Sequence, residues 1–180
     1  QPIAVITGGA RGIGRQLATD LLARGYLVVI GDLDQAATDA TAAELGAGAS
    51  AVRLDVTDRK NLAAVVAHVE ATVGPIALWI NNAGIMPTGP FRDQKMAVAR
   101  AIIDINYAGV VEGTAAVLPG MLERHAGTIV NLASATGIKP LAGVAVYSGT
   151  KAAVIAFTQS LRRELRGTGV RLIVVSPNLV

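Results

Sequence analysis

Short apolar runs alternate along the chain with longer segments in which apolar residues recur at helical spacing. The runs lack the regular apolar and polar alternation of a strand with one wet face, which indicates strands buried on both faces. Six strands are predicted at residues 3–6, 26–32, 49–54, 75–80, 127–133 and 170–175. Helices are predicted at 15–24, 35–45, 59–73, 93–123 and 144–166, the fourth interrupted near Gly109 and at Pro119. This alternation predicts an α/β fold with a three-layer, doubly wound parallel sheet and right-handed crossovers.

The first predicted strand runs directly into a glycine-rich turn, Thr-Gly-Gly-Ala-Arg-Gly-Ile-Gly, at residues 7–14. Its glycines at 8, 12 and 14 let the backbone turn tightly and bring N–H groups at a helix N-terminus close to a diphosphate. A P-loop is disfavoured, because Arg15 and Gln16 stand where that motif has Lys and Ser or Thr. The spacing also differs from Gly-x-Gly-x-x-Gly, so a plain glycine turn stays open as an alternative.

Asp32 ends the second predicted strand, at the edge of the sheet where ligands of this fold class bind. Its carboxylate would accept hydrogen bonds from both hydroxyls of an adenosine ribose and repel a 2′-phosphate, which favours NAD over NADP. Leu33 adds no positive charge to offset that repulsion, whereas Arg11 acts in the opposite direction. Asp32 could instead cap the next helix, a role for which Asp34 competes.

Polar residues also follow the third and fourth predicted strands. Residues 55–58, Asp-Val-Thr-Asp, end the third strand and are expected to cap the next helix. Asp55 could meet an adenine amino group or be only a capping or turn residue. Residues 81–84, Asn-Asn-Ala-Gly, combine amides with small side chains that suit close approach of a cofactor, or form an ordinary turn. Asn106 lies within an otherwise apolar helical segment, at a position that disfavours helix.

Tyr147 and Lys151 are four residues apart in a predicted helix, so their side chains lie on one face, one turn apart. A phenol beside an ammonium is a candidate acid/base pair. The pKa of tyrosine is about 10, and lowering it by roughly three units requires about 4 kcal/mol. One cation at about 4 Å supplies that much at an effective dielectric near 20. Ser134, at the end of the fifth strand, could fold back against this helix; a packed tyrosine beside an exposed lysine is the alternative.

Composition narrows the classes of protein. The 180 residues fit one domain, and 52% hydrophobic content with a mean hydropathy of +0.49 supports a buried sheet. The net charge of +3 comes from scattered basic residues, and with 3% aromatics a nucleic-acid partner is not expected.

No unbroken apolar run reaches the roughly 18 residues of a membrane span, so no membrane partner is expected. No signal peptide is visible, and the absence of cysteine is compatible with a cytoplasmic protein. The two histidines have no ligand partners in the sequence, so no metal is expected.

The whole chain resembles the classical short-chain dehydrogenase/reductase family. The matching pieces are the turn at 7–14, Asp55-Val56, residues 81–84, Asn106, Ser134 and Tyr-Ser-Gly-Thr-Lys at 147–151. The resemblance implies a Rossmann-like sheet of strand order 3-2-1-4-5-6 and a single NAD-binding domain over residues 1–180. It also implies a seventh strand and a substrate-covering segment beyond Val180, so we expect the sequence to be a fragment. Pro177-Asn178 departs from the usual Pro-Gly, although Asn tolerates a left-handed conformation best among the non-glycine residues.

The resemblance also implies roles for individual residues. Tyr147 would be the general acid/base, Lys151 would hold the nicotinamide ribose and lower the pKa of Tyr147, and Ser134 would hydrogen-bond the substrate oxygen. Asn106 would position a water for proton relay. Cofactor contacts are implied at Gly8, Arg11, Gly12, Ile13, Gly14, Asp32, Leu33, Asp55, Val56, Asn82, Ala83, Gly84, Tyr147, Lys151, Pro177 and Val180.

The resulting hypothesis is an NAD-dependent dehydrogenase or reductase of a small, apolar secondary alcohol or ketone. Its substrate pocket could be lined by Ile85, Met86, Pro87, Leu141, Ala142 and Val144, although each of these could equally be a core or interface residue. Two alternatives are a 3-oxoacyl thioester reductase that uses NADPH and a non-catalytic NAD-binding module. The apolar surface of the segments 93–123 and 144–166 predicts a homodimer or homotetramer formed through these two helices.

Overall fold

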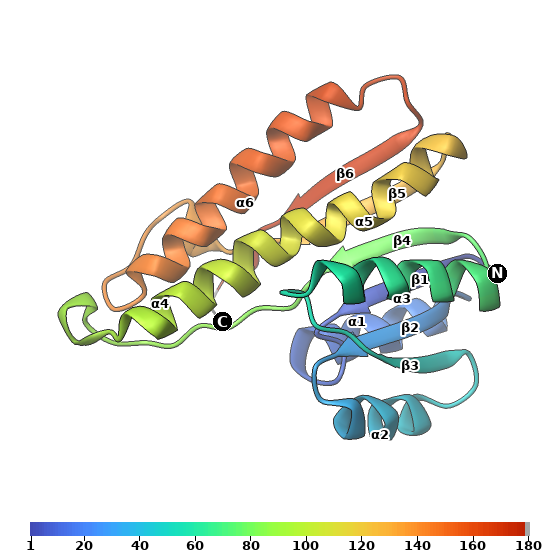
Figure 1. The fold of residues 1–180 in the computed structure, drawn as a ribbon, viewed down its shortest axis with the longest axis horizontal. Coiled ribbons are helices and arrows are strands. Elements are labelled where there is room, and N and C mark those ends of the chain that lie inside the picture. The colour runs from blue at the N-terminus through green and yellow to red at the C-terminus, as the bar shows by residue number, and fades with distance from the viewer. Residues whose placement is uncertain (179–180) are drawn as a thin grey trace.

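Six parallel strands form one sheet in the order β3-β2-β1-β4-β5-β6 (Figure 1). The computed structural model describes residues 1–178. The strands are β1 (Ile3–Thr7), β2 (Leu27–Asp32), β3 (Ala49–Arg53), β4 (Ile76–Asn81), β5 (Gly127–Leu132) and β6 (Val170–Val175). The predicted order and the parallel sheet are therefore confirmed, and each predicted strand differs from the observed one by at most one residue at either end.

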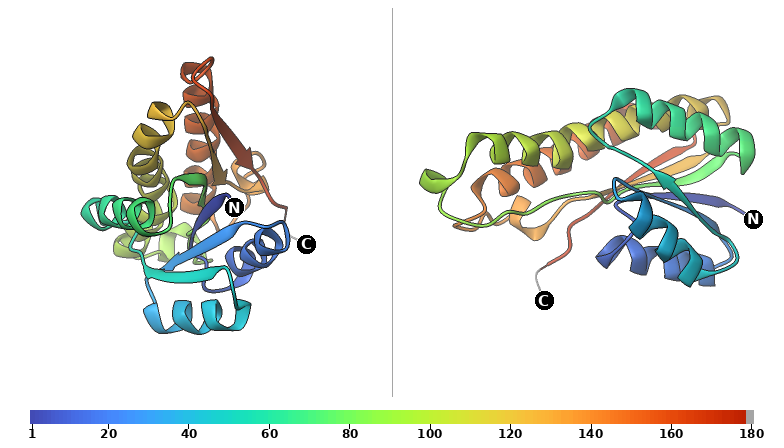
Figure 2. Two further views of the ribbon diagram at one scale, coloured as in Figure 1. Left: turned by 90° about the vertical axis from the view of Figure 1, so that its right-hand side faces the viewer. Right: turned by 60° about the horizontal axis from the view of Figure 1, so that its bottom comes forward.

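Helices cover both faces of the sheet (Figure 2). The helices are α1 (Gly12–Ala23), α2 (Gln35–Leu45), α3 (Arg59–Thr72), α4 (Met96–Ile103), α5 (Gly109–Glu123) and α6 (Ala145–Glu164). Along β1, Ala4 and Ile6 pack with α1 and α2, whereas Ile3 and Val5 face the core shared with α3 and α5. Because successive side chains of a strand point to opposite faces, a central strand with both faces covered must be apolar throughout.

Two of the α-helices begin at a side-chain cap. Asp34 caps α2 by accepting from the N–H of Ala37, and Asp58 caps α3 by accepting from the N–H groups of Lys60 and Asn61. Both helices begin where they were predicted. Helix α1 begins at Gly12 instead of residue 15, since the glycine turn itself forms its first turn.

The helical segment predicted from Asp93 differs from the structure in two ways. Phe91–Asp93 is a separate 3₁₀ turn, and α4 begins only at Met96. The predicted break at Pro119 is wrong, because α5 passes through it. Pro119 and Ala115 are on the exposed side of the helix, so the Ala115 carbonyl that loses its intrahelical partner faces water. The break predicted near Gly109 is a π turn, Asp104–Ala108, which ends just before that glycine.

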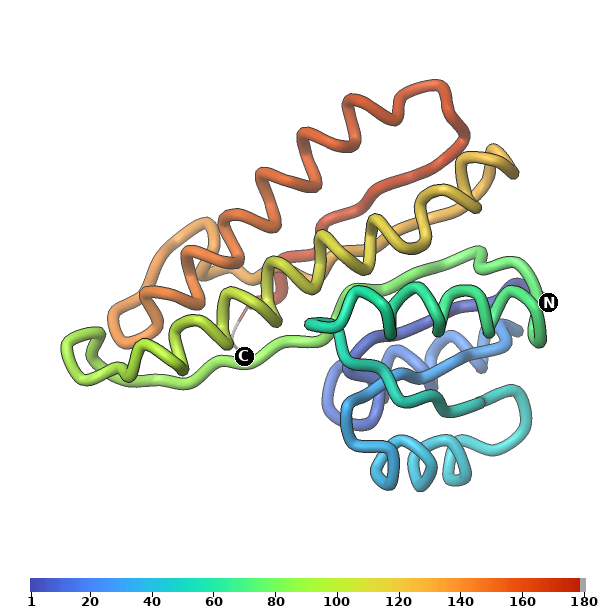
Figure 3. The backbone as a smooth tube through the Cα atoms, viewed as in Figure 1, coloured from blue at the N-terminus to red at the C-terminus, as the bar shows by residue number. Residues whose placement is uncertain are grey.

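Helix α4, the π turn and α5 run as one continuous rod of 28 residues, seen as a single path in Figure 3. Within the described part of the chain, this is the one helix long and apolar enough to cross a membrane, although no unbroken apolar run suggested one. Val110, Val117 and Met121 of α5 are buried in the protein's own core. The apolar character of α5 thus has a structural explanation in its packing against the core of the protein.

Candidate active site

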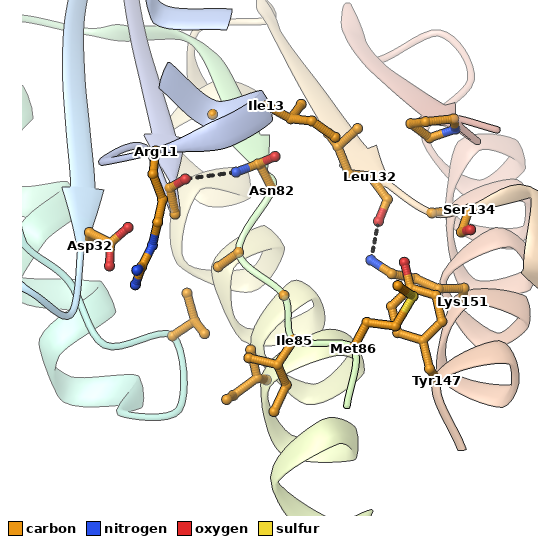
Figure 4. A pocket seen from close by; sticks show the side chains of 18 of the residues that line it. Arg11, Ile13, Asp32, Asn82, Ile85, Met86, Leu132, Ser134, Tyr147 and Lys151 are labelled. Atoms are coloured by element: carbon orange, nitrogen blue, oxygen red, sulfur yellow. Dashed lines mark hydrogen bonds between the residues drawn. The ribbon is translucent and has the colours of Figure 1, made fainter. Parts of the chain in front are cut away.

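A cavity of ≈ 670 Å³ opens at the carboxyl ends of the strands. It draws residues from the turns after β1, β2, β3, β4 and β5 and from α6, which lie far apart in the sequence (Figure 4). Among the predicted site residues, the cavity lining includes Gly8, Arg11, Ile13, Gly14, Asp32, Leu33, Asp55, Val56, Asn82, Ala83, Gly84, Ser134, Tyr147, Lys151 and Pro177. Gly12 and Asn106 do not line it, and Val180 lies outside the described residues.

The glycine turn after β1 is tightly packed against the turn after β4. Gly8 has a φ of +66°, and a Cβ there would lie 2.8 Å from the Cα of Ala83. A Cβ on Gly14 would collide with the carbonyl of Gly8 and lie 2.7 Å from Nδ2 of Asn82. Only a residue without a side chain fits at these two positions. The N-terminus of α1 and its unpaired N–H groups therefore stay accessible to an anion.

Asn82 links these two turns by hydrogen bonds. Its Nδ2 donates to the carbonyls of Thr7 and Gly8, both at 2.9 Å, and its own N–H donates to Oγ1 of Thr7 at 3.0 Å. The N–H of Ala83 donates to the same hydroxyl at 3.0 Å. The side-chain amide of Asn82 therefore holds the glycine turn in its conformation. It would affect a bound cofactor indirectly, through the shape of that turn.

Asp32 faces the cavity, and Arg11 lies beside it (Figure 4). One carboxylate oxygen of Asp32 accepts from the N–H of Ala10 at 3.3 Å, and the other accepts a long contact from the N–H of Asp34 at 3.5 Å. Because Asp34 caps α2, the alternative in which Asp32 serves as the cap does not hold. Asp32 is instead a fixed acceptor at the edge of the cavity.

Asp55 is turned toward its own loop. Its Oδ1 accepts from the hydroxyl of Thr57 at 2.7 Å and from the N–H of Thr57 at 2.9 Å. These two bonds, led by the hydroxyl, lower the pKa of the Asp55 carboxyl. The turn role that the sequence left open is therefore present, and Asp55 still lines the cavity.

Lys151 is a buried cation at the junction of α6 and β5. Its side chain is 4% exposed, and its ammonium donates to the carbonyl of Leu132 at 2.7 Å (Figure 4). Burial lowers its pKa from the ordinary 10.5 to about 8. The ammonium lies 5.6 Å from the centre of the Tyr147 ring, one helical turn away. Among the described residues the Leu132 carbonyl is its one hydrogen-bond acceptor, so two of its three protons remain for other acceptors in the cavity.

Ser134 begins the 3₁₀ turn Ala135–Gly137 that follows β5. Its Oγ accepts from the N–H of Thr136 at 3.2 Å and from the hydroxyl of Thr136 at 3.0 Å. A Cβ on Gly137 would lie 2.7 Å from the carbonyl carbon of Lys151, so the turn packs directly on the backbone of α6. Thr136 was missed in the sequence, although a threonine two residues after a serine at a strand end is a signal for such a turn.

Asn106 sits in the π turn and is fully buried. Its Oδ1 accepts from the N–H of Ile85 and its Nδ2 donates to the carbonyl of Ile85, both at 2.8 Å. These two bonds hold the segment after β4, from which Ile85 and Met86 line the cavity. The structure thus gives Asn106 a backbone-anchoring contact, and its part in a water relay stays a proposal.

A chain of buried polar groups lies below the cavity and was not predicted. Nε1 of Trp79 donates to Oδ1 of Asn81 at 2.7 Å, and Nδ2 of Asn81 donates to Oδ1 of Asn131 at 2.8 Å. Nδ2 of Asn131 then donates to Oγ1 of Thr158 on α6 at 3.0 Å. Since Asn131 directly precedes Leu132, this chain fixes α6 against β5 close to the Lys151 contact.

The apolar part of the cavity differs from the prediction. Ile85 and Met86 line it, whereas Pro87, Leu141, Ala142 and Val144 do not. Ile105, within the π turn, lines it as well.

The lining residues fit a dinucleotide cofactor. The glycine turn leaves no room for a side chain at Gly14 and presents backbone at the start of α1, Asp32 offers a fixed acceptor, and Lys151 carries unused donors. These three groups suit a diphosphate, a ribose and a second ribose, respectively.

Comparison with known proteins agrees with this architecture. The sequence matches the short chain dehydrogenase family over residues 2–180. It is 40% identical over 168 residues to a 2-dehydro-3-deoxy-L-rhamnonate dehydrogenase (NAD(+)) of a Sphingomonas strain, and 38% identical over 179 residues to the ketoacyl reductase HetN of a Nostoc strain. Those matches cover 93% and 98% of this chain but 67% and 62% of the relatives. A crystal structure of serine dehydrogenase from Escherichia coli superposes with a TM-score of 0.94 at 35% identity, covering 99% of this chain and 83% of that one.

Proposed function

Because the chain belongs to the short-chain dehydrogenase family, we propose that it transfers hydride between NAD and a secondary alcohol or ketone at the cavity described above. The observation that carries this proposal is that Ser134, Tyr147 and Lys151 line the same cavity as the glycine turn, at one edge of the sheet. A bound nicotinamide supplies the hydride acceptor for oxidation or the hydride donor for reduction. The chain's own residues supply binding and proton transfer.

Tyr147 is assigned the proton at the substrate oxygen. In the oxidation, its phenolate oxygen accepts the hydroxyl proton of the alcohol, and in the reduction its phenol returns that proton to the carbonyl oxygen. The ammonium of Lys151, held by Leu132 and 5.6 Å from the centre of the Tyr147 ring, is assigned to the nicotinamide ribose. The hydroxyl of Ser134 donates to the substrate oxygen and stabilises the charge that develops there. Asn106 holds the Ile85 segment, and we retain for it the proposed proton relay through a water.

The preference for NAD over NADP rests on Asp32. The N–H of Ala10 holds its carboxylate at the cavity edge, where a 2′-phosphate would bring two anions together. Arg11 lies beside Asp32 and could offset part of that repulsion. The name of the Sphingomonas relative, which specifies NAD(+), supports the same preference.

A small, apolar substrate is proposed from the apolar side chains that line the cavity together with Tyr147. Ile85, Met86 and Ile105 line the cavity and offer apolar contact to the carbon substituents of an alcohol. The only polar groups we assign to the substrate oxygen are the Ser134 and Tyr147 hydroxyls.

Reduction of a 3-oxoacyl thioester with NADPH is the second candidate function. The ketoacyl reductase HetN is 38% identical to this chain, and Arg11 at the cavity could bind a 2′-phosphate. A module that binds NAD without catalysis would need neither the Lys151 contact nor a free Ser134 proton, and we rank it below both enzymes.

One assay separates these three functions. The absorbance of reduced nicotinamide is followed with NAD and NADP against a panel of secondary alcohols, and with NADH and NADPH against ketones and 3-oxoacyl thioesters. Turnover of alcohols with NAD supports the first function, and turnover of thioesters with NADPH supports the second. Cofactor binding by calorimetry without turnover of any substrate would leave the binding module.

We further propose a homodimer or homotetramer built through α4, α5 and α6. Met96 and Ile103 of α4 are large apolar side chains that remain exposed in the isolated chain, at 61% and 45%. Sedimentation at several concentrations tests this, and a single monomer species would contradict it.

A cytoplasmic protein without nucleic-acid or membrane partners is proposed from composition alone, and cell fractionation tests that.

A further inference from the structure

Ser134 and Thr136 form a pair of buried hydroxyls in the wall of the cavity. Their side chains belong to residues that are 8% and 3% exposed. Two donors of Thr136 point at the same oxygen: its N–H lies 3.2 Å and its Oγ1 lies 3.0 Å from Oγ of Ser134. The first of these bonds caps the 3₁₀ turn, and the second involves the side chain alone.

This arrangement restricts the direction of the Ser134 proton. A serine hydroxyl has one proton and two acceptor lone pairs. With two donors bound to Oγ, both lone pairs are in use, so the proton must point away from Thr136. Within residues 1–178 no protein group accepts it, and the remaining direction leads into the cavity that Ser134 lines.

We propose that Thr136 is a positioning residue for the reaction, because its hydroxyl donates to Ser134 and thereby directs the Ser134 proton toward the substrate oxygen. This inference rests on the proposed function. Negative charge builds on the substrate oxygen in the transition state, and the Ser134 hydrogen bond strengthens there. A donor on Ser134 polarises that hydroxyl further, since consecutive hydrogen bonds reinforce one another. An interaction that grows in the transition state acts on kcat more than on KM.

Two substitutions distinguish the effect of the Thr136 hydroxyl from that of the rest of its side chain. Thr136→Val removes the hydroxyl and keeps the branched shape, whereas Thr136→Ser keeps the hydroxyl and removes a methyl. Both retain the N–H that caps the turn. We expect Thr136→Val to lower kcat about tenfold with KM changed by less than about twofold, as for loss of one hydrogen bond to a polarised group. Thr136→Ser should restore kcat to within about threefold of the unmodified protein.

A double-mutant cycle with Ser134→Ala distinguishes positioning from a general effect on the fold. If Thr136 acts through Ser134, Thr136→Val should lower kcat by less than about twofold once Ser134 has been replaced. An equal loss of kcat in both backgrounds would overturn the proposal, as would an unchanged kcat in Thr136→Val alone. If Thr136→Val does not fold, as judged by circular dichroism, Thr136→Ala takes its place in the same cycle.

The same measurements keep this proposal distinct from the proposed function. Absence of turnover in the unmodified protein, with every substrate of the panel, overturns both. Turnover in the unmodified protein with an additive cycle overturns only the assignment of Thr136. Calorimetric titration with NAD serves as a further readout, and each Thr136 variant should bind NAD as the unmodified protein does, since Thr136 contacts Ser134 and not the glycine turn.

Discussion

The ammonium of Lys151 is hydrogen-bonded to the carbonyl of Leu132 at 2.7 Å. Leu132 is the last residue of β5, and Lys151 lies on α6 one turn after Tyr147. This contact therefore joins the helix that carries Tyr147 to the strand that leads into Ser134. The three side chains of the proposed reaction share one junction, so their spacing depends on the packing of α6 against β5.

The stability of the protein should depend on pH through Lys151. Its pKa is about 8 in the folded protein and 10.5 ordinarily, so below pH 8 the ammonium is charged in both states and its burial destabilises the fold. Between these values the folded protein binds fewer protons than the unfolded chain, so stability rises with pH, by up to about 3 kcal/mol. Urea unfolding at pH 8 and pH 10 should show this rise in the unmodified protein and not in Lys151→Met. Lys139→Met, which removes an exposed lysine, is the matched control.

Replacement of Tyr147 should lower the rate of the reaction and leave the affinity for NAD nearly unchanged. Tyr147→Phe removes the proton-transfer group and keeps the ring, so kcat should fall by about 10²-fold or more. The affinity for NAD, measured by calorimetry, should stay within about threefold. Tyr26→Phe changes a tyrosine that lies outside the cavity and should retain full activity. Near-normal turnover in Tyr147→Phe would refute the assigned mechanism.

Asp32 should decide the choice of cofactor. Asp32→Ser removes the negative charge and leaves Arg11 in place, so kcat/KM with NADP should rise relative to NAD by about tenfold or more. Arg11→Gln provides the opposite change and should lower any use of NADP. Steady-state kinetics with both cofactors measures the ratio, and an unchanged ratio in Asp32→Ser would show that the discrimination lies elsewhere.

The glycine turn should tolerate no side chain at Gly14. Gly14→Ala places a methyl group against the Gly8 carbonyl and the Asn82 amide, so NAD binding and stability should both fall. Gly149 offers a matched control, because it lies in α6 and a Cβ added there would have no heavy atom of another segment within 4 Å. Gly149→Ala should raise the free energy of unfolding by about 0.5–1 kcal/mol, as expected for a helical glycine. Thermal unfolding and NAD titration of both variants test the contrast.

The buried polar chain should contribute to both stability and activity. Thr158→Val leaves Nδ2 of Asn131 without its acceptor in the core, which should destabilise the protein by about 1–3 kcal/mol. Because Thr158 holds α6 against β5, kcat should also fall. Thr72→Val removes an exposed hydroxyl that bonds only within its own helix, and it should change the free energy of unfolding by less than about 0.5 kcal/mol. Similar unfolding curves for the two variants would contradict the role given to the chain.

Several features of the fold were predictable because their causes are local. The caps at Asp34 and Asp58 act within one helical turn, and α2 and α3 begin as predicted. The start of α4 and the continuity of α5 through Pro119 were not, because packing on the sheet and exposure to water decide whether a proline interrupts a helix.

Among the residues around the cavity, too, some positions were predictable from the sequence and others were not. The pattern of strand ends was sufficient to bring Gly14, Asp32 and Ser134 to one edge of the sheet, since parallel strands place all their carboxyl ends on the same side. Leu141 is a predicted pocket residue that does not line the cavity. How far a loop projects depends on contacts with other segments, and no local pattern records them.

The sequence by itself determined the order of strands and helices, the burial of the sheet on both faces, and the polar residues that follow each strand. Hydrophobic periodicity, glycine conformation and helix caps operate over a few neighbouring residues and can be recognised in one chain. Only the tertiary structure decided which partner each polar group binds: Asn106 with Ile85, Asn81 with Asn131 and Lys151 with Leu132. These bonds join residues 19 to 50 positions apart, and they form only because the helices settle at particular distances from the sheet.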